Sequence, residues 1–250
     1  MLLRELVTGR KANKLYSPWC QFNTRARVVT LFGHIISSTN IQEAGVSEST
    51  PCIAEETVGA LMLLAQESSD PVKIAFNNVG GSIQAGFLIV ETIEHLQAKG
   101  IEVIGLVKNE SYSVASVILA ACTKGKRFCT HRGIVHLHMP KVSVPFSREE
   151  DADKIRGHQQ FLSEQFYRLL AERTNLAQFY LNRFRGSGSE VNQIREDAET
   201  QVGATKCIRE LLKSEMYLSP REAVDAGIID DVLGPGDGRL DEIFKLGAIP

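Results

Sequence analysis

The chain has 250 residues, of which 43% are hydrophobic and 23% are charged, which is ordinary for a globular protein with a full core. This composition excludes a largely disordered chain. The 28 basic and 30 acidic side chains are interspersed and give a net charge of −2, so neither nucleic acid nor an anionic membrane surface is indicated as a partner. We expect proteins, peptides or small molecules instead.

Cysteine content and the N-terminal residues bear on the compartment. The five cysteines form no Cys-x-x-Cys pair, and their odd number argues against a disulfide framework and favours a reducing environment. The segment Met1–Leu6 reaches charged residues too early for the apolar part of a signal peptide. No stretch of about 18 apolar residues is present to span a bilayer. We expect a protein of the cytoplasm or of an organelle interior.

Strands and helices are expected to alternate after an arm at residues 1–25. The expected elements up to Pro140 are a strand Arg27–Ile36, a loop Ser37–Pro51, a helix Ile53–Gln66, a strand Val72–Asn77, a turn Asn78–Ser82, a helix Ile83–Gly100, a strand Val103–Val107, a turn Lys108–Tyr112, a helix Ser113–Thr123 and a strand that ends at Pro140. This order predicts an α/β fold with a parallel sheet and right-handed crossovers. Ligands bind such sheets beyond the carboxyl ends of the strands.

Two of these strand ends carry residues suited to acyl transfer. Ser113 lies where a strand passes into a helix, and the free N–H groups and positive dipole end there can stabilise an oxyanion. Between another strand and helix, Gly80 and Gly81 allow the backbone to approach a substrate and direct an N–H towards it. Taken alone, a serine at the start of a helix is most often just a cap, and a Gly-Gly turn is commonplace. A phosphate-binding loop is not indicated, because no Gly-x-x-x-x-Gly-Lys-Ser/Thr motif is present.

The strand that ends at Pro140 carries two histidines on one face. Because side chains alternate along a strand, His136 and His138 point to the same side. A neutral imidazole there can accept a hydroxyl proton and later deliver it to a leaving amine, or can simply satisfy a hydrogen bond in the core. A His-x-His metal site is a third interpretation, but no third ligand occurs at a telling spacing.

The second half of the chain changes character. The charged segment Ser147–Arg173 has only a narrow apolar stripe, which predicts a long helix that contacts another subunit. After it, Asn175–Lys213 predicts two helical parts separated at Gly186–Ser189. The remaining expected elements are a helix with a capping box of Ser219, Pro220 and Glu222, a short strand opened by Ala226–Asp230, and a tail Arg239–Pro250 with a short helix.

Several of these segments resemble one family. The run Leu119–Phe128, followed by Val135–Pro140, resembles the proteolytic subunit of the Clp protease (ClpP), a serine peptidase, and the resemblance covers most of residues 25–175 and 214–233. It implies a ClpP/crotonase-like spiral of β-β-α units as a single domain at 26–233, with a tail at 234–250. The segment 147–173 would be the protruding handle helix, and 175–213 would hold an insertion of about twenty-five residues.

The resemblance also assigns roles to residues. It places the catalytic serine on Ser113, the histidine on His138 and the acid on Glu215, where the family usually has aspartate. Glutamate can orient an imidazole if its extra methylene has room. The oxyanion donors would be Gly81 and Val114, with Gly80 at the substrate. Rival candidates are Ser111 and Ser116 for the nucleophile and Asp197 and Glu199 for the acid.

Assembly and activity follow from the same resemblance. It implies heptameric rings stacked as a tetradecamer, which receive unfolded polypeptides from an ATP-driven unfoldase of the AAA+ type, with no cofactor or metal in the chain itself. The chain departs from the family at Glu110–Tyr112, where small residues are usual, at Val114 in place of methionine, and at Lys141–Phe146 in place of a glycine-rich stretch. Two alternatives therefore stay open: an inactive structural subunit of such a complex, and a crotonase-type acyl-CoA enzyme.

Overall fold

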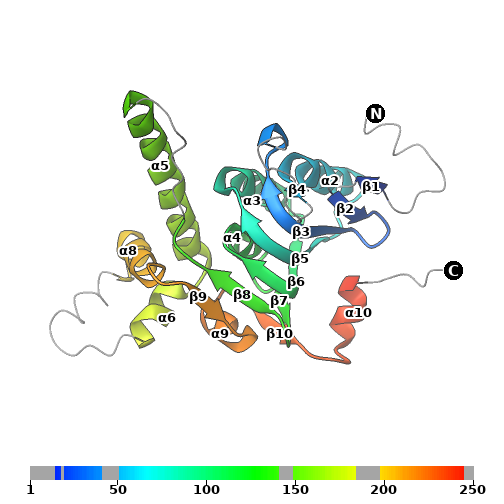
Figure 1. Cartoon of the computed structure of the whole chain (residues 1–250). Helices are drawn as coiled ribbons and strands as arrows, with labels where there is room; N and C mark the ends of the chain where they lie inside the picture. Colours follow the sequence, from blue (N-terminus) through cyan, green and yellow to red (C-terminus); the bar gives the residue numbers. More distant parts are fainter. Residues whose placement is uncertain (1–14, 18–19, 41–50, 141–148, 184–197, 245–250) are drawn as a thin grey trace.

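The computed structural model describes residues 15–17, 20–40, 51–140, 149–183 and 198–244 (Figure 1). The strands are β1 (Leu15–Ser17), β2 (Cys20–Asn23), β3 (Val28–Ile36), β4 (Pro51–Ile53), β5 (Val72–Gly81), β6 (Val103–Tyr112), β7 (Arg127–Thr130), β8 (Ile134–Leu137), β9 (Met216–Leu218) and β10 (Asp231–Leu233). The helices are the 3₁₀ turn η1 (Ser38–Asn40), α2 (Ala54–Glu67), α3 (Ile83–Ala98), α4 (Val114–Ala121), α5 (Glu149–Arg173), α6 (Leu176–Arg183), α8 (Gln201–Leu211), α9 (Pro220–Asp225) and α10 (Gly238–Phe244).

One mostly parallel sheet organises the fold. Its order is β1-β2-β3-β5-β6-β7-β10, and all neighbours from β3 to β10 along this path run parallel. Beyond this path β8 pairs with β6 in parallel, and β9 pairs with β8 in antiparallel orientation. The expected α/β fold with a parallel sheet is therefore confirmed. Figure 1 shows α5 projecting from the body of the molecule.

Helix α4 lies at the centre of the core. All eight of its residues are buried, as expected of a helix that is apolar on every side. It packs against α3, α5 and the strands β5 and β6. The contact with α3 is close because Gly86 has no side chain, and a Cβ at that position would clash with Val114. This packing fixes the start of α4, and with it Ser113.

The two turns expected before the candidate site residues are strands. In place of a turn at Lys108–Tyr112, β6 continues to Tyr112, because the pairing of Glu110–Tyr112 with β8 gives this polar segment ladder hydrogen bonds. Its register with β5 shifts between the pairs Phe76–Val107 and Asn78–Ser111. In the same way β5 runs on to Gly81, so the turn expected at Asn78–Ser82 was also wrong.

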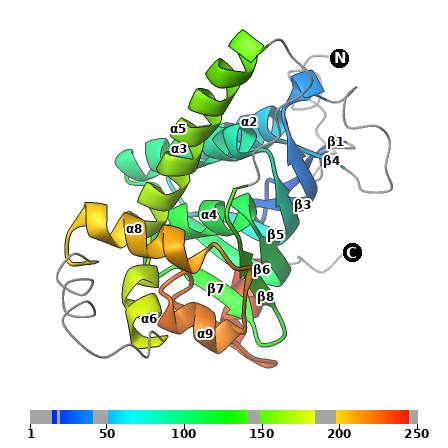
Figure 2. The same ribbon diagram turned by 60° about the vertical axis from the view of Figure 1, so that its left-hand side comes forward.

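The remaining segments agree with the sequence more closely. The arm expected at residues 1–25 contains the antiparallel pair β1–β2 within its described part, and residues 1–14 lie outside it. Helix α5 lies where a helix was expected at 147–173, and α6 and α8 are two helices within 175–213. The proposed break at Gly186–Ser189 and the segment Lys141–Phe146 lie outside the described residues. Figure 2 shows α6 and α8 beside the base of α5, with which both are in contact.

The capping box of α9 is confirmed. The Ser219 hydroxyl accepts a hydrogen bond from the Glu222 N–H, and the Glu222 carboxylate accepts one from the Ser219 N–H at 3.0 Å. The Ser219 hydroxyl and N–H bonds hold the Glu222 carboxyl pKa below its usual range, since both favour the charged form. The cap fixes the chain directly after β9, the strand that follows Glu215.

Four cysteines in the described part of the chain form no disulfide, and all four are buried: Cys52, Cys122, Cys129 and Cys207. Burial raises the pKa of the Cys122 and Cys129 thiols to about 12, because the thiolate would lose its hydration. These thiols stay protonated at neutral pH and act as small apolar core residues.

Candidate active site

Ser113 occupies a strained turn between β6 and α4. Its φ of 56° and ψ of −126° lie in a region that residues with a Cβ rarely adopt, at a cost on the order of 1–3 kcal/mol. The Ser113 N–H donates to the His136 carbonyl at 2.8 Å, which fixes the turn to β8. A sharp strand-to-helix turn of this kind exposes the hydroxyl of a nucleophile above the end of a sheet. The geometry of Ser113 therefore suits a nucleophile better than a simple helix cap.

Gly80, at the end of β5, lies directly against this turn. Its φ is +87°, and a Cβ there would lie 2.6 Å from the Tyr112 carbonyl oxygen and 2.7 Å from the Ser113 Cβ. The Asn78 side chain accepts a hydrogen bond from the Gly80 N–H at 2.8 Å and so fixes the end of β5. Gly81 has a φ of +149°, and a Cβ there would clash with the Ile35 backbone. Gly80 is therefore required for the close approach of β5 to Ser113, and Gly81 for the close approach of β5 to β3.

Substitution of Gly80 by alanine is expected to lower the free energy of unfolding by about 1–3 kcal/mol and to displace Ser113. The added methyl group would meet backbone atoms that cannot move independently. Urea unfolding measures the loss of stability. Gly100→Ala is the matched control, since Gly100 has a φ of +79° but open space around its Cβ position. Equal losses for the two variants would contradict the close contact proposed for Gly80.

A cavity of about 450 Å³ connects the candidate nucleophile with the candidate base. Ser113, His138 and Gly81 all line it, together with residues of α5. Its titratable lining side chains, within the described residues, are histidines, and no carboxylate, lysine or arginine lines it. The lining residues are His34, Val79, Gly81, Ser82, Ile83, Gln84, Ser113, His138, Pro140, His158, Gln159, Leu162, Ser163 and Phe166.

His138 follows β8 and is half-buried. Its Nδ1 lies 2.8 Å from the Met139 carbonyl oxygen. A carbonyl can only accept, so this contact assigns the proton to Nδ1 and leaves Nε2 as the acceptor that a general base needs. No hydrogen bond joins the Ser113 hydroxyl to the His138 ring in the described structure. Such bonds often form only once substrate is bound.

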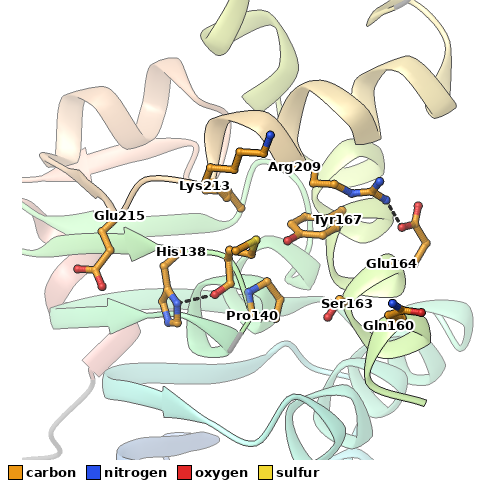
Figure 3. A pocket seen from close by; sticks show the side chains of 11 residues that line it. His138, Pro140, Gln160, Ser163, Glu164, Tyr167, Arg209, Lys213 and Glu215 are labelled. Atoms are coloured by element: carbon orange, nitrogen blue, oxygen red, sulfur yellow. Dashed lines mark hydrogen bonds and ion pairs between the residues drawn. The ribbon is translucent and has the colours of Figure 1, made fainter. Parts of the chain in front are cut away.

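Glu215 lies on the other side of His138. Both residues line a second cavity of about 940 Å³ between α5, α8 and the segment after β8 (Figure 3). The Glu215 side chain is 55% exposed, and its Oε2 lies 3.9 Å from His136 Nε2 and 3.4 Å from the Tyr217 hydroxyl. Among the described residues, Glu215 forms no hydrogen bond or ion pair with His138. The structure thus places Glu215, the expected acid, beside β8. The imidazole nearest to its carboxylate is that of His136.

The rival serines are core residues. Ser111 and Ser116 are fully buried, and the Ser116 hydroxyl lies 2.5 Å from the Ser111 carbonyl oxygen and 3.0 Å from that of His136. Neither serine lines the cavity that contains His138. Glu199 is exposed near the start of α8, and Asp197 lies outside the described residues.

The two expected oxyanion donors come from different elements, α4 and β5. Val114 is the first residue of α4, so its N–H has no partner within the helix. Gly81 lines the cavity itself. Within the described residues, no group of three metal-ligating side chains is present.

Two features of the site were missed in the sequence. The first is Asn78, whose side chain accepts a hydrogen bond from the Gly80 N–H. Asparagine side chains often bond the backbone two residues further on, and this tendency could have indicated the contact. The second is a cluster of aromatic rings around His136, formed by Tyr112, Tyr217 and His138. No local signal predicts that cluster, because its members come from three strands.

A strained serine at a strand-to-helix turn, a histidine across the same cavity and glycines at the neighbouring strand end define a hydrolase-like α/β site. The family model described as Clp protease matches residues 23–236, which is most of the chain. The chain therefore belongs to the Clp protease family, which is a family of peptidases. None of the described helices combines the length and the apolar character needed to cross a membrane.

Proposed function

We propose that this protein is a ClpP-type serine endopeptidase that cleaves peptides and unfolded polypeptides. The observation that carries the proposal is the strained Ser113 turn, which shares one cavity with His138 and Gly81. Membership of the Clp protease family supports a peptidase over a crotonase-type acyl-CoA enzyme. If the protein turned over an acyl-CoA, and the Ser113→Ala variant did so as well, the crotonase-type enzyme would become the better proposal.

In the proposed reaction, the Ser113 hydroxyl attacks the peptide carbonyl and His138 Nε2 accepts its proton. The N–H groups of Gly81 and Val114 stabilise the oxyanion, and loss of one such donor typically costs about 3 kcal/mol in the barrier. His138 then protonates the leaving amine, and water hydrolyses the acyl-enzyme by the same steps in reverse. Glu215 is the acid that supports His138, and Gly80 keeps the backbone open to the substrate.

The proposal includes the assembly. Heptameric rings stacked as a tetradecamer would enclose the cavities, and α5, which projects from the body of each subunit, suits contact between rings (Figure 1). ATP would be consumed by a partner unfoldase and not by this chain. The expected location is the cytoplasm or an organelle interior.

A fluorophosphonate probe tests the proposal on the assembled protein. A covalent adduct on Ser113, located by peptide mass spectrometry, is expected, because the probe reacts only with an activated serine. A peptide chloromethyl ketone should in turn alkylate His138. Absence of both adducts in correctly assembled rings would contradict the peptidase proposal.

That negative result would favour the second candidate, an inactive structural subunit. Two observations support this alternative: no hydrogen bond joins the Ser113 hydroxyl to His138 among the described residues, and the Glu215 carboxylate lies nearest to His136. The discriminating measurement is labelling in mixed rings, in which a structural subunit would stay unlabelled while an active partner subunit reacts.

A further inference from the structure

His136 lies at the centre of a ring cluster beside the candidate base. It is only 6% exposed, and its ring stacks on that of Tyr217 at 4.1 Å and on that of His138 at 5.3 Å between centroids. The Tyr112 ring meets it edge-on at 5.3 Å. The His138 ring therefore packs against the His136 ring on one side.

His136 also contacts the other parts of the site. Its carbonyl accepts the Ser113 N–H at 2.8 Å, so the same residue holds the backbone of the candidate nucleophile. Its Nε2 lies 3.9 Å from the Glu215 carboxylate, within ion-pair distance. The Nδ1 of His138 is already satisfied by the Met139 carbonyl. A carboxylate is therefore not needed at that nitrogen to select the tautomer, and Glu215 contacts a different ring.

We propose that Glu215 acts on His138 through His136, which is a positioning residue: its ring pairs with the Glu215 carboxylate and forms the surface on which His138 is held. The inference deepens the proposed function, on which it rests for the role of His138 as the base. It differs from the direct contact between acid and base that the family resemblance implies.

Two tyrosines complete the ring cluster around His136 in the described structure: Tyr112 from β6 and Tyr217 from β9, with Glu110 beside Tyr112. Burial raises the pKa of Tyr112, and the Glu110 carboxylate raises it further, so that ring stays neutral at pH 7. The Tyr112 ring therefore adds no charge beside His136.

Hydrogen–deuterium exchange at the histidine C2 position, followed by mass spectrometry on the assembled protein, tests this coupling. Four proteins are compared: wild type, Glu215→Gln, His136→Phe and the double variant. We expect Glu215→Gln to change the exchange rate of His138 at pH 7 about threefold in the wild-type background and not in the His136→Phe background. An equal change in both backgrounds would overturn the proposal, because Glu215 would then act on His138 directly.

Peptide hydrolysis provides the second readout. Glu215→Gln and His136→Phe should each lower kcat about tenfold with little change in KM, and the double variant should be no worse than either single variant. If the double variant instead lost the sum of the two single effects on the activation free energy, Glu215 and His136 would act independently, which would contradict the proposal. Glu210→Gln is the matched control, since this exposed carboxylate at the end of α8 pairs with Lys213, just beyond that helix, and should change neither readout.

The exchange measurement needs no turnover, so the two proposals can fail separately. If fluorophosphonate does not label Ser113 but Glu215→Gln changes exchange at His138 only in the presence of His136, the peptidase proposal fails and the linkage stands. If fluorophosphonate labels Ser113 but Glu215→Gln changes exchange at His138 equally with and without His136, the peptidase proposal stands and the linkage fails. Should His136→Phe not assemble, His136→Gln, which also removes the imidazole, serves in its place.

Discussion

Replacement of Ser113 by alanine is expected to abolish peptide hydrolysis, with a loss in kcat of at least about 1000-fold. The reason is that the proposed mechanism forms its covalent bond at this hydroxyl, and no other serine in the described structure combines a positive φ with a place beside His138. A short fluorogenic peptide measures the rate. The stability of the variant should not fall, because the hydroxyl makes no hydrogen bond in the described structure.

The control for this prediction is Ser116→Ala. The Ser116 hydroxyl is buried and shares its one O–H between two backbone carbonyl oxygens, so its removal should cost about 1 kcal/mol of stability and leave hydrolysis by the folded protein in place. Loss of hydrolysis in Ser116→Ala, with activity retained in Ser113→Ala, would show that the nucleophile has been misassigned.

Replacement of Arg127 by methionine is expected to lower the free energy of unfolding by about 3–5 kcal/mol. Arg127 is 2% exposed, and its guanidinium binds the Asp230 carboxylate through two bonds, of 2.6 and 3.0 Å. It also donates to the Arg173 carbonyl at 3.0 Å. One side chain thus joins β7, the end of α5 and the residue before β10, and its loss leaves the partly buried Asp230 carboxylate with backbone N–H donors but no positive charge beside it. Urea unfolding followed by circular dichroism measures the effect.

Arg239→Met is the matched control for this ion pair. Arg239 pairs with Asp231 and Asp237, but it is solvent-exposed, and exposed pairs contribute about 0–1 kcal/mol. A loss for Arg127→Met as small as that for Arg239→Met would contradict the structural role assigned to the buried pair.

The same pair predicts how stability depends on pH. Burial alone would raise the pKa of the Asp230 carboxyl, but hydrogen bonds from Arg127 and its positive charge outweigh burial and hold the pKa below its usual range. A carboxyl with a lowered pKa contributes stability above its unfolded-state pKa of about 3.9, and this contribution is lost as the pH falls through the folded-state pKa. Between about pH 5 and pH 3, wild type should therefore lose more stability than Asp230→Asn. Parallel curves for the two proteins would contradict the prediction.

The elements with a strong local signal could be predicted from the sequence. The apolar spacing from Ile83 gives α3, and the Ser219–Glu222 capping box gives the start of α9, because both signals depend on contacts within one helix. The turns expected at 78–82 and 108–112 were wrong for the opposite reason. Those polar segments are strands only because β3, β6 and β8 supply hydrogen bonds from distant parts of the chain.

The sequence by itself determined the order of strands and helices, the α/β class and the family, since Leu119–Phe128 and Val135–Pro140 are local patterns. It also placed Ser113 and His138 at strand ends, which the parallel sheet then brings to one cavity. Only the tertiary structure decided the strained conformation of Ser113, the close approach of Gly80 and the position of Glu215 beside His136. These features depend on the register and packing of β5, β6, β8 and β9, which are far apart in sequence, and no local pattern encodes distances between them.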